Sequence, residues 1–144
     1  MSTVLLTTDG SVLAAEAIET GLKLLGNGHR LVALTVVPPA SPALSLSPMG
    51  PGPDPTLADE LEARTTREQT GELQSLLERL GINAEARVEV GDAGDTICSV
   101  ADEIGADVVV IGSHGNGRLK EILLGSVSHH VLHHAPCPVL TVRT

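Results

Sequence analysis

Glycine residues are concentrated in one stretch of the chain, between residues 108 and 126. The stretch opens with the β-branched run 108–111, which is typical of a strand buried on both faces. The glycines that follow are Gly112, Gly115, Gly117 and Gly125, and Ser126 then begins a segment with helical apolar periodicity. Glycine lets a backbone approach a ligand closely, and the free N–H groups of a helix start carry partial positive charge. A strand, a glycine-rich loop and a helix start are together typical of an anion site, most naturally for phosphate.

Two better-known phosphate motifs do not fit this stretch. The Walker pattern nearly matches from Gly112 to Gly117, but Arg118 and Leu119 stand where Lys and Ser or Thr are required. The dinucleotide fingerprint fails because Gly115 and Gly117 have no third glycine three residues on and do not follow the first strand. The residues alone therefore leave two interpretations, a phosphate loop of another kind and a loop whose glycines serve only tight turns.

Composition limits the classes of function. The 144 residues suit one domain, and the net charge of −9 would repel nucleic acid and anionic lipid. The chain has no aromatic residue, so the core must be aliphatic and no platform for base stacking exists. No apolar run reaches the length of a membrane span and no signal region is apparent. We therefore expect no nucleic-acid or membrane partner, a cytoplasmic location, and buried free thiols at Cys98 and Cys137.

Hydrophobic periodicity predicts strands that alternate with helices along the chain. The expected strands are 3–8, 31–37, 82–90, 108–111 and 139–142, and the expected helices are 11–25, 56–80, 95–104 and 126–135. Such alternation indicates an α/β fold with an open, mostly parallel sheet and helices on both faces. The alternating pattern of 82–90 and the prolines before 139 place these two strands at the edges of the sheet. Residues 38–56 are rich in proline and lack periodicity, which predicts a flexible loop within the single domain 1–144.

The spacing of Gly112, two residues, Gly115, nine residues and Gly125-Ser126 resembles a known nucleotide-binding signature. It is the signature of the universal stress protein family, in its ATP-binding branch. The resemblance extends to residues 7–11 (TTDGS), 35–37 (TVV) and 135–140 (APCPVL), and it covers nearly the whole chain apart from 38–56. It implies a Rossmann-like parallel sheet of order 3-2-1-4-5, in which the carboxyl ends of strands one and four are neighbours. Ligands of open α/β sheets bind at such a point.

The resemblance also assigns roles to single residues. It implies that Asp9 holds the adenosine, that the backbone of Val36 contacts adenine, and that the remaining signature residues bind phosphate, namely Gly112, Gly115, Gly125 and Ser126. Further candidate phosphate contacts in the loop are His114, Arg118 and Lys120. The implied ligand is ATP with Mg²⁺, which phosphate oxygens and water would hold rather than a protein cage. Without the rest of the motif, Asp9 would be read as a capping group at a helix start.

The sequence contains no recognisable pair of nucleophile and base, so we assign no catalytic residue and expect at most slow ATP hydrolysis. Four histidines on the last predicted helix, His129, His130, His133 and His134, form two i, i+4 pairs, a spacing that can bind zinc. The two pairs lie along different lines on the helix, and the Glu of the metalloprotease motif is missing. We therefore favour the interpretation that these histidines lie on the helix surface or in a dimer contact, and we predict no metal site.

The function that the resemblance implies is ATP binding by a nucleotide-dependent regulator of the stress response. Two alternatives stay open: a slow ATPase or adenylyl-transferring enzyme, and a nucleotide-free dimeric interaction module. The last strand, 139–142, is apolar on both faces yet lies at a sheet edge, where one row of backbone groups stays unpaired. Because the resembled family commonly pairs this strand with its copy, we expect a homodimer through Val139–Val142.

Overall fold

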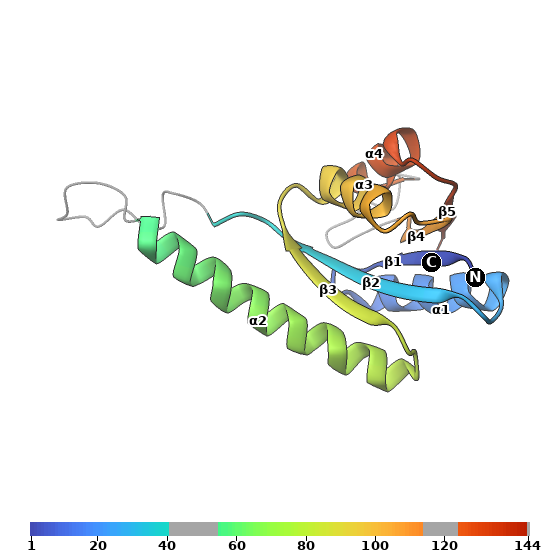
Figure 1. Ribbon diagram of the computed structural model, residues 1–144, viewed down its shortest axis with the longest axis horizontal. Coiled ribbons are helices and arrows are strands. Elements are labelled where there is room, and N and C mark those ends of the chain that lie inside the picture. Colours follow the sequence, from blue (N-terminus) through green and yellow to red (C-terminus); the bar gives the residue numbers. More distant parts are fainter. Residues whose placement is uncertain (41–54, 114–123, 144) are drawn as a thin grey trace.

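The computed structural model describes residues 1–40, 55–113 and 124–143. In chain order the elements are β1 (Thr3–Thr7), α1 (Val12–Leu25), β2 (Arg30–Val37), α2 (Pro55–Leu80), β3 (Glu85–Val90), α3 (Ala93–Glu103), β4 (Val108–Gly112), α4 (Ser126–His134) and β5 (Val139–Val142). The strands form one parallel sheet of order β3-β2-β1-β4-β5, and helices cover both faces (Figure 1). This confirms the predicted fold class and strand order. Most of the predicted loop, 41–54, lies outside the described residues.

Two predicted boundaries were wrong, each for a local reason. The third strand begins at Glu85 rather than at 82, because residues 81–84 return from α2 before pairing with β2 starts. In that return Gly81 has φ +67° and the Ile82 N–H donates to the carbonyl of Leu77. The third helix begins at Ala93 rather than near 95, because Asp92 is its N-cap and accepts from the backbone N–H of Asp95 at 3.0 Å.

The core consists of two aliphatic layers, one on each face of the sheet. Strand residues alternate between them, so that Leu6 packs on the face of α1 and α2 while Leu5 packs on the face of α3 and α4. Both side chains are fully buried. We call these faces the α1–α2 face and the α3–α4 face. Burial on both faces explains why β1, β2 and β4 have nearly continuous apolar sequences.

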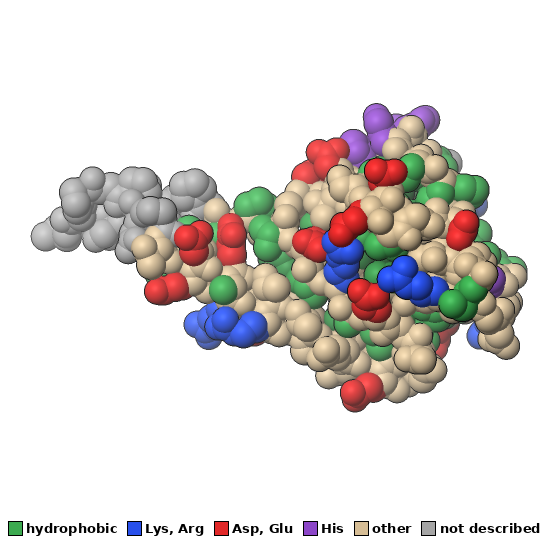
Figure 2. Space-filling view, in the orientation of Figure 1, with side chains coloured by type: hydrophobic (Ala, Val, Ile, Leu, Met, Phe, Trp, Pro, Cys, Tyr) green, Lys and Arg blue, Asp and Glu red, His purple; other side chains and the backbone are tan. Residues whose placement is uncertain are grey.

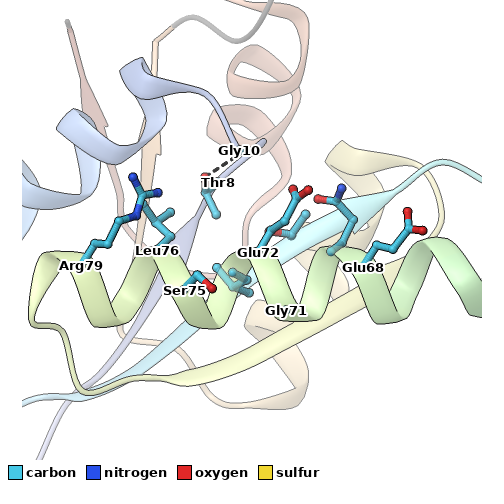
Figure 3. Close-up of a pocket in the computed structure, with 11 residues that line it drawn as sticks. Thr8, Gly10, Glu68, Gly71, Glu72, Ser75, Leu76 and Arg79 are labelled. Carbon is cyan, nitrogen blue, oxygen red and sulfur yellow. Dashed lines mark hydrogen bonds between the residues drawn. The ribbon is translucent and has the colours of Figure 1, made fainter.

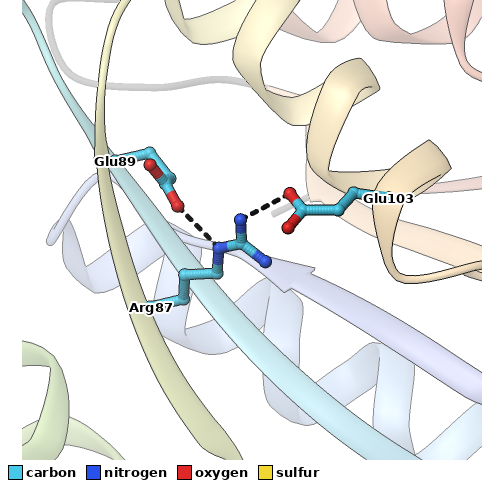
Figure 4. Close-up of polar contacts among 3 residues, drawn as sticks. All are labelled: Arg87, Glu89 and Glu103. Carbon is cyan, nitrogen blue, oxygen red and sulfur yellow. Dashed lines mark hydrogen bonds and ion pairs between the residues drawn. The ribbon is translucent and has the colours of Figure 1, made fainter.

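The two edge strands differ in how their flanks are covered. On β3, Arg87 bonds to Glu89 of the same strand at 2.7 Å and to Glu103 of α3 at 2.5 Å (Figure 4). These two hydrogen bonds raise the pKa of Arg87 and link the edge strand to the helix above it. Charged side chains of this kind discourage pairing with another strand. The other edge, β5, carries only apolar residues and one threonine.

The helix α2 is longer than the sheet face that it covers. It packs against β3 and β2 through its C-terminal half, where Leu73 and Leu77 are buried. Its N-terminal half extends beyond the sheet (Figure 1). Ala40, which follows β2, is tied to this half because its N–H donates to Glu62 at 2.9 Å. The chain therefore leaves the C-terminal edge of the sheet and returns along α2.

Gly21 of α1 sets how closely that helix approaches β4. A Cβ atom at Gly21 would lie 2.6 Å from Cγ1 of the fully buried Val110, whereas a Cβ at Gly71 of α2 would meet nothing within 4 Å. We expect Gly21→Val to lower the free energy of unfolding by about 2 kcal/mol, because the core cannot accept the added volume. Gly71→Val should change it by less than about 0.5 kcal/mol. Urea unfolding followed by far-ultraviolet circular dichroism measures both, and equal effects would contradict this account of the packing.

Candidate functional site

The candidate site lies at the C-terminal edge of the sheet, where the strand order changes direction. From β1 the chain adds β2 and β3 on one side, then crosses back over the sheet and adds β4 and β5 on the other side of β1. Asp9 follows β1 after one residue, Val36 is the second-last residue of β2, and Gly112 is the last residue of β4. The fold thus brings three of the predicted site residues, which are far apart in sequence, to one edge. This is the position at which open α/β sheets bind ligands.

The turn from β1 into α1 is held by side chains. The Ser11 hydroxyl accepts from the Ala14 N–H at 3.1 Å, so Ser11 is the N-cap of α1. The Asp9 carboxylate accepts from the Ser11 N–H at 2.9 Å, and the Thr8 hydroxyl accepts from the Gly10 N–H at 3.0 Å. Gly10 has φ +84°, a conformation that suits glycine. Since Ser11 caps the helix, Asp9 is an exposed carboxylate held at the edge of the site rather than the N-cap.

The end of β2 extends beyond the ladder that this strand forms with β1. The carbonyl of Leu34 accepts from the Thr8 N–H at 3.0 Å, and this bond closes the ladder between β1 and β2. Alternate residues of a strand direct their backbone groups to the same side, so the N–H and C=O of Val36 face the β1 side beyond the end of that ladder. The next residue, Val37, faces the other way and accepts from Gly91. Val36 is therefore the residue of β2 whose backbone faces the candidate site.

The start of α4 supplies backbone donors that the helix itself does not use. Its N-cap is Gly125, which has no side chain to bond the first turn. The carbonyl of Gly125 accepts from His129, and its N–H donates to the carbonyl of Ser113 at 2.6 Å. The N–H groups of residues 126–128 come before the first intrahelical bond and have no acceptor within the helix. They lie at the positive end of the helix dipole, beside the end of β4, and suit an anion.

Two buried hydroxyls lie near this helix start. The side chain of Ser128 donates to the carbonyl of Gly112 at 2.5 Å, which ties α4 to the end of β4. Ser113 is 1% exposed, and within the described part of the chain its hydroxyl has no hydrogen-bond partner. The Thr141 hydroxyl of β5 is likewise buried and has no hydrogen-bond partner among the described residues. Ser113 and Thr141 follow Ile111 and Val139 by two residues, so both face the α3–α4 face that α4 covers.

The structure does not describe every predicted site residue. Gly115, His114, Arg118 and Lys120 lie in 114–123, outside the described residues. The sequence does not single out Ser113, Ser128 and Thr35, because a small hydroxyl residue near the end of a strand or the start of a helix carries no motif. A cavity of about 630 Å³ was also missed. It opens between α2 and the β1–α1 turn and reaches Thr8, Gly10 and Thr35 (Figure 3).

The four histidines belong to α4, where histidine side chains gather on the surface of the molecule (Figure 2). Ring centroids are 4.4 Å apart both in the pair His129 and His133 and in the pair His130 and His134. His130 Nε2 lies 2.9 Å from a carboxylate oxygen of Asp95, so this contact joins α4 to α3. Among the described residues no three metal-ligating side chains are placed to hold an ion.

The two cysteines are free and half-buried, not buried as predicted. Both pack against the core of the α3–α4 face. Burial raises the pKa of both thiols, and Asp95 adds to this at Cys98 while Asp107 adds to it at Cys137. A raised pKa keeps a thiol protonated and unreactive at neutral pH.

Comparison with known proteins gives a consistent result. The model of the universal stress protein family matches residues 1–143. Universal stress protein Sll1388 of Synechocystis is 32% identical over 149 residues, which cover 97% of this chain and 96% of that protein. The solved structure of MJ0577, a universal stress protein of Methanocaldococcus jannaschii, aligns with a TM-score of 0.82 and 26% identity over 99% of this chain and 96% of that one. A universal stress protein solved in complex with cAMP aligns with a TM-score of 0.61 and 26% identity, covering 98% and 95% of the two chains. No helix among the described residues has the length and apolarity needed to cross a bilayer.

The two serines near α4 should respond oppositely to truncation. Ser113→Ala removes a buried hydroxyl without a partner, so we expect the free energy of unfolding of the ligand-free protein to rise by about 1 kcal/mol. Ser128→Ala removes a buried hydrogen bond to Gly112 and should lower it by about 1 kcal/mol. Urea unfolding measures both values. A loss of stability in Ser113→Ala would show that its hydroxyl has a partner in the ligand-free protein.

Proposed function

The chain belongs to the universal stress protein family, and we propose that it binds ATP at the C-terminal edge of its sheet and acts as a cytoplasmic, nucleotide-dependent regulator of a stress response. One observation carries the proposal. The end of β2 beyond its ladder with β1 and the first N–H groups of α4, which have no acceptor within the helix, lie on opposite sides of the turn that holds Asp9. Such an arrangement offers polar contacts to both ends of one nucleotide.

The adenosine end would lie towards β2 and Asp9. Adenine carries a donor and an acceptor on neighbouring atoms of one edge, and the N–H and C=O of Val36 offer the complementary pair on one side of the strand. The Asp9 carboxylate is exposed and can accept from a ribose hydroxyl. Adenine binding by backbone groups needs no special side chain, which agrees with an apolar residue at this position.

The phosphate end would lie at α4. The N–H groups of residues 126–128 and the hydroxyl of Ser126 are donors for phosphate oxygens, and the glycine at Gly125 leaves room for close approach. The Ser113 hydroxyl, which has no partner among the described residues, is a further donor at this place. Mg²⁺ would be held by phosphate oxygens and water, in keeping with its preference for few protein ligands. The ion would offset phosphate charge in a protein whose own net charge is −9.

A relative supports an adenine nucleotide as the ligand class. The universal stress protein solved with cAMP shares this fold and 26% of its residues with the chain. The G-2x-G-9x-G-S spacing of this chain, from Gly112 to Ser126, adds the glycine loop that a longer phosphate group would contact. We assign no catalytic residue, and the regulator role follows from binding rather than turnover.

We also propose that two copies pair through β5. The carbonyls of Pro138 and Val142 accept from β4, so the backbone groups of Val139 and Thr141 face away from the sheet. Leu140 and Val142 pack on the α1–α2 face of the protein's own core. The outward row of N–H and C=O groups, on a strand without charged residues, suits pairing with its own copy across a two-fold axis.

Ser126→Pro tests the phosphate site without disturbing the helix. Ser126 is the first residue of α4, a position that proline favours, and Gly125 before it is extended as proline requires. The substitution removes an N–H and a hydroxyl, so we expect ATP affinity to fall about tenfold or more with no loss of thermal stability. Ser126→Ala, which keeps the N–H, should lower the affinity for ATP by less. Gly115→Val should lower it as well, because the valine side chain obstructs the approach of phosphate. Calorimetry measures these affinities. If folded Ser126→Pro bound ATP as tightly as the wild type, the phosphate site at α4 would be refuted.

Thr141→Pro tests the dimer. It removes an N–H that faces outward and leaves pairing between β4 and β5 intact, so the protein should become monomeric. Thr141→Val keeps the N–H and should stay dimeric. Light scattering with refractive-index detection is suitable because the chain has no Trp or Tyr. A wild-type monomer at micromolar concentration, with and without ATP, would overturn the proposal.

A further inference from the structure

The cavity beside α2 is lined by polar groups that the fold itself does not use. Its floor is the edge of the sheet, with Thr8 and Thr35, and one wall is the α2 helix, with Gln69, Glu72 and Arg79 (Figure 3). The volume of about 630 Å³ is within the range of small-ligand sites. Gln69, Glu72, Thr35 and Arg79 make no side-chain hydrogen bond or ion pair with other described residues. Glu68, which also lines the cavity, is paired with Arg64 at 3.2 Å.

The cavity adjoins the end of β2 that faces the candidate site. Thr8 and Thr35 lie beside each other on β1 and β2, because Thr8 donates to the neighbouring Leu34, and they are 7% and 6% exposed. Thr35 turns its side chain to the α1–α2 face and into the cavity, while Val36 directs its backbone beyond the end of β1. Adjacent strands are about 4.8 Å apart, so the ends of β2 and β4 are separated by about 10 Å across β1. One nucleotide bridges such a span.

Charge distinguishes the two ends of this span. The cavity lining carries the carboxylates of Glu68 and Glu72 and the guanidinium of Arg79, and Glu68 is paired with Arg64, so the lining offers phosphate no excess of positive charge. The α4 start, with its free N–H groups, attracts phosphate. A nucleotide across β1 would therefore direct its uncharged nucleoside end into the cavity.

We propose that α2 forms the nucleoside-reading wall of the site, with Glu72 accepting from the ribose hydroxyls and Gln69 facing the edge of the base. The inference rests on the proposed nucleotide binding and adds residues that the glycine signature does not include. Figure 3 shows Glu72 rising from α2 towards the β1–α1 turn, from which Asp9 also comes. A carboxylate can only accept, which suits the two hydroxyls of a ribose. A side-chain amide both donates and accepts, which suits the amine and N7 of adenine, on the edge of the base that Val36 does not contact.

The direct test compares ATP with 2′-deoxy-ATP and 3′-deoxy-ATP by calorimetry, in the wild type and in Glu72→Ala. The wild type should prefer ATP over at least one deoxy analogue by about tenfold, because a hydrogen bond to a carboxylate is lost. In Glu72→Ala the preference should fall to within about twofold. The control is Glu78→Ala, which removes the same charge from α2 at an exposed residue outside the cavity and should keep the wild-type preference.

The base contact is tested in the same way with inosine triphosphate, which carries a carbonyl where ATP carries the amine. Gln69→Ala should lower the preference for ATP, because only the contact of Val36 with the amine is left, whereas Gln74→Ala, at an exposed glutamine of α2 outside the cavity, should retain the wild-type preference. Unchanged preferences in both Glu72→Ala and Gln69→Ala, with ATP still bound, would overturn the role of α2 and leave the proposed function standing. A wild-type protein that does not bind ATP would instead refute the proposed function itself.

Discussion

Burial of the parallel strands on both faces is the constraint on which the rest of this structure depends. Leu5 and Leu6 are neighbours in β1, yet each is fully buried in a different aliphatic layer. Such a strand needs helices on both sides, and every parallel connection must return across the sheet to the same edge. The carboxyl ends of all the strands are therefore gathered at one edge. Because β1 lies in the middle of the order, its end faces those of both β2 and β4.

The candidate site consists largely of backbone groups that regular structure leaves over at this edge. The ladder between β1 and β2 closes at Leu34, so Val36 has backbone groups to spare. The helix α4 begins with a glycine N-cap and so lacks the side-chain bond that Ser11 gives to α1. The hydroxyl of Ser113, without a partner in the part of the chain that the structure describes, adds to this set. Polar groups without a hydrogen-bond partner lower the stability of the ligand-free protein slightly, and a ligand that bonds to them removes this cost.

The sequence predicts the architecture well, because apolar periodicity reports burial directly. The five strands, their order and both edges follow from runs such as 108–111, from the alternation in β3 and from the family resemblance. Of the site, Asp9, Val36, Gly112, Gly125 and Ser126 are brought to one edge or to the helix that follows it, whereas four predicted residues lie outside the described parts. The cavity wall of α2 could not be foreseen. Which helix faces lie beside Thr8 and Thr35 depends on packing angles, and polar residues such as Gln69 and Glu72 look the same on a solvent-facing helix.

The central claim is that one nucleotide spans β1 from the end of β2 to the start of α4. Amide chemical shifts of isotope-labelled protein, recorded during titration with ATP and Mg²⁺, test it most directly. The account predicts large, saturable shifts at residues 9–11, at 35–36 and at 126–128, with little change at the opposite edge near Thr3, Arg30 and Glu85. Shifts confined to the histidine surface of α4, or no shifts at all, would contradict it.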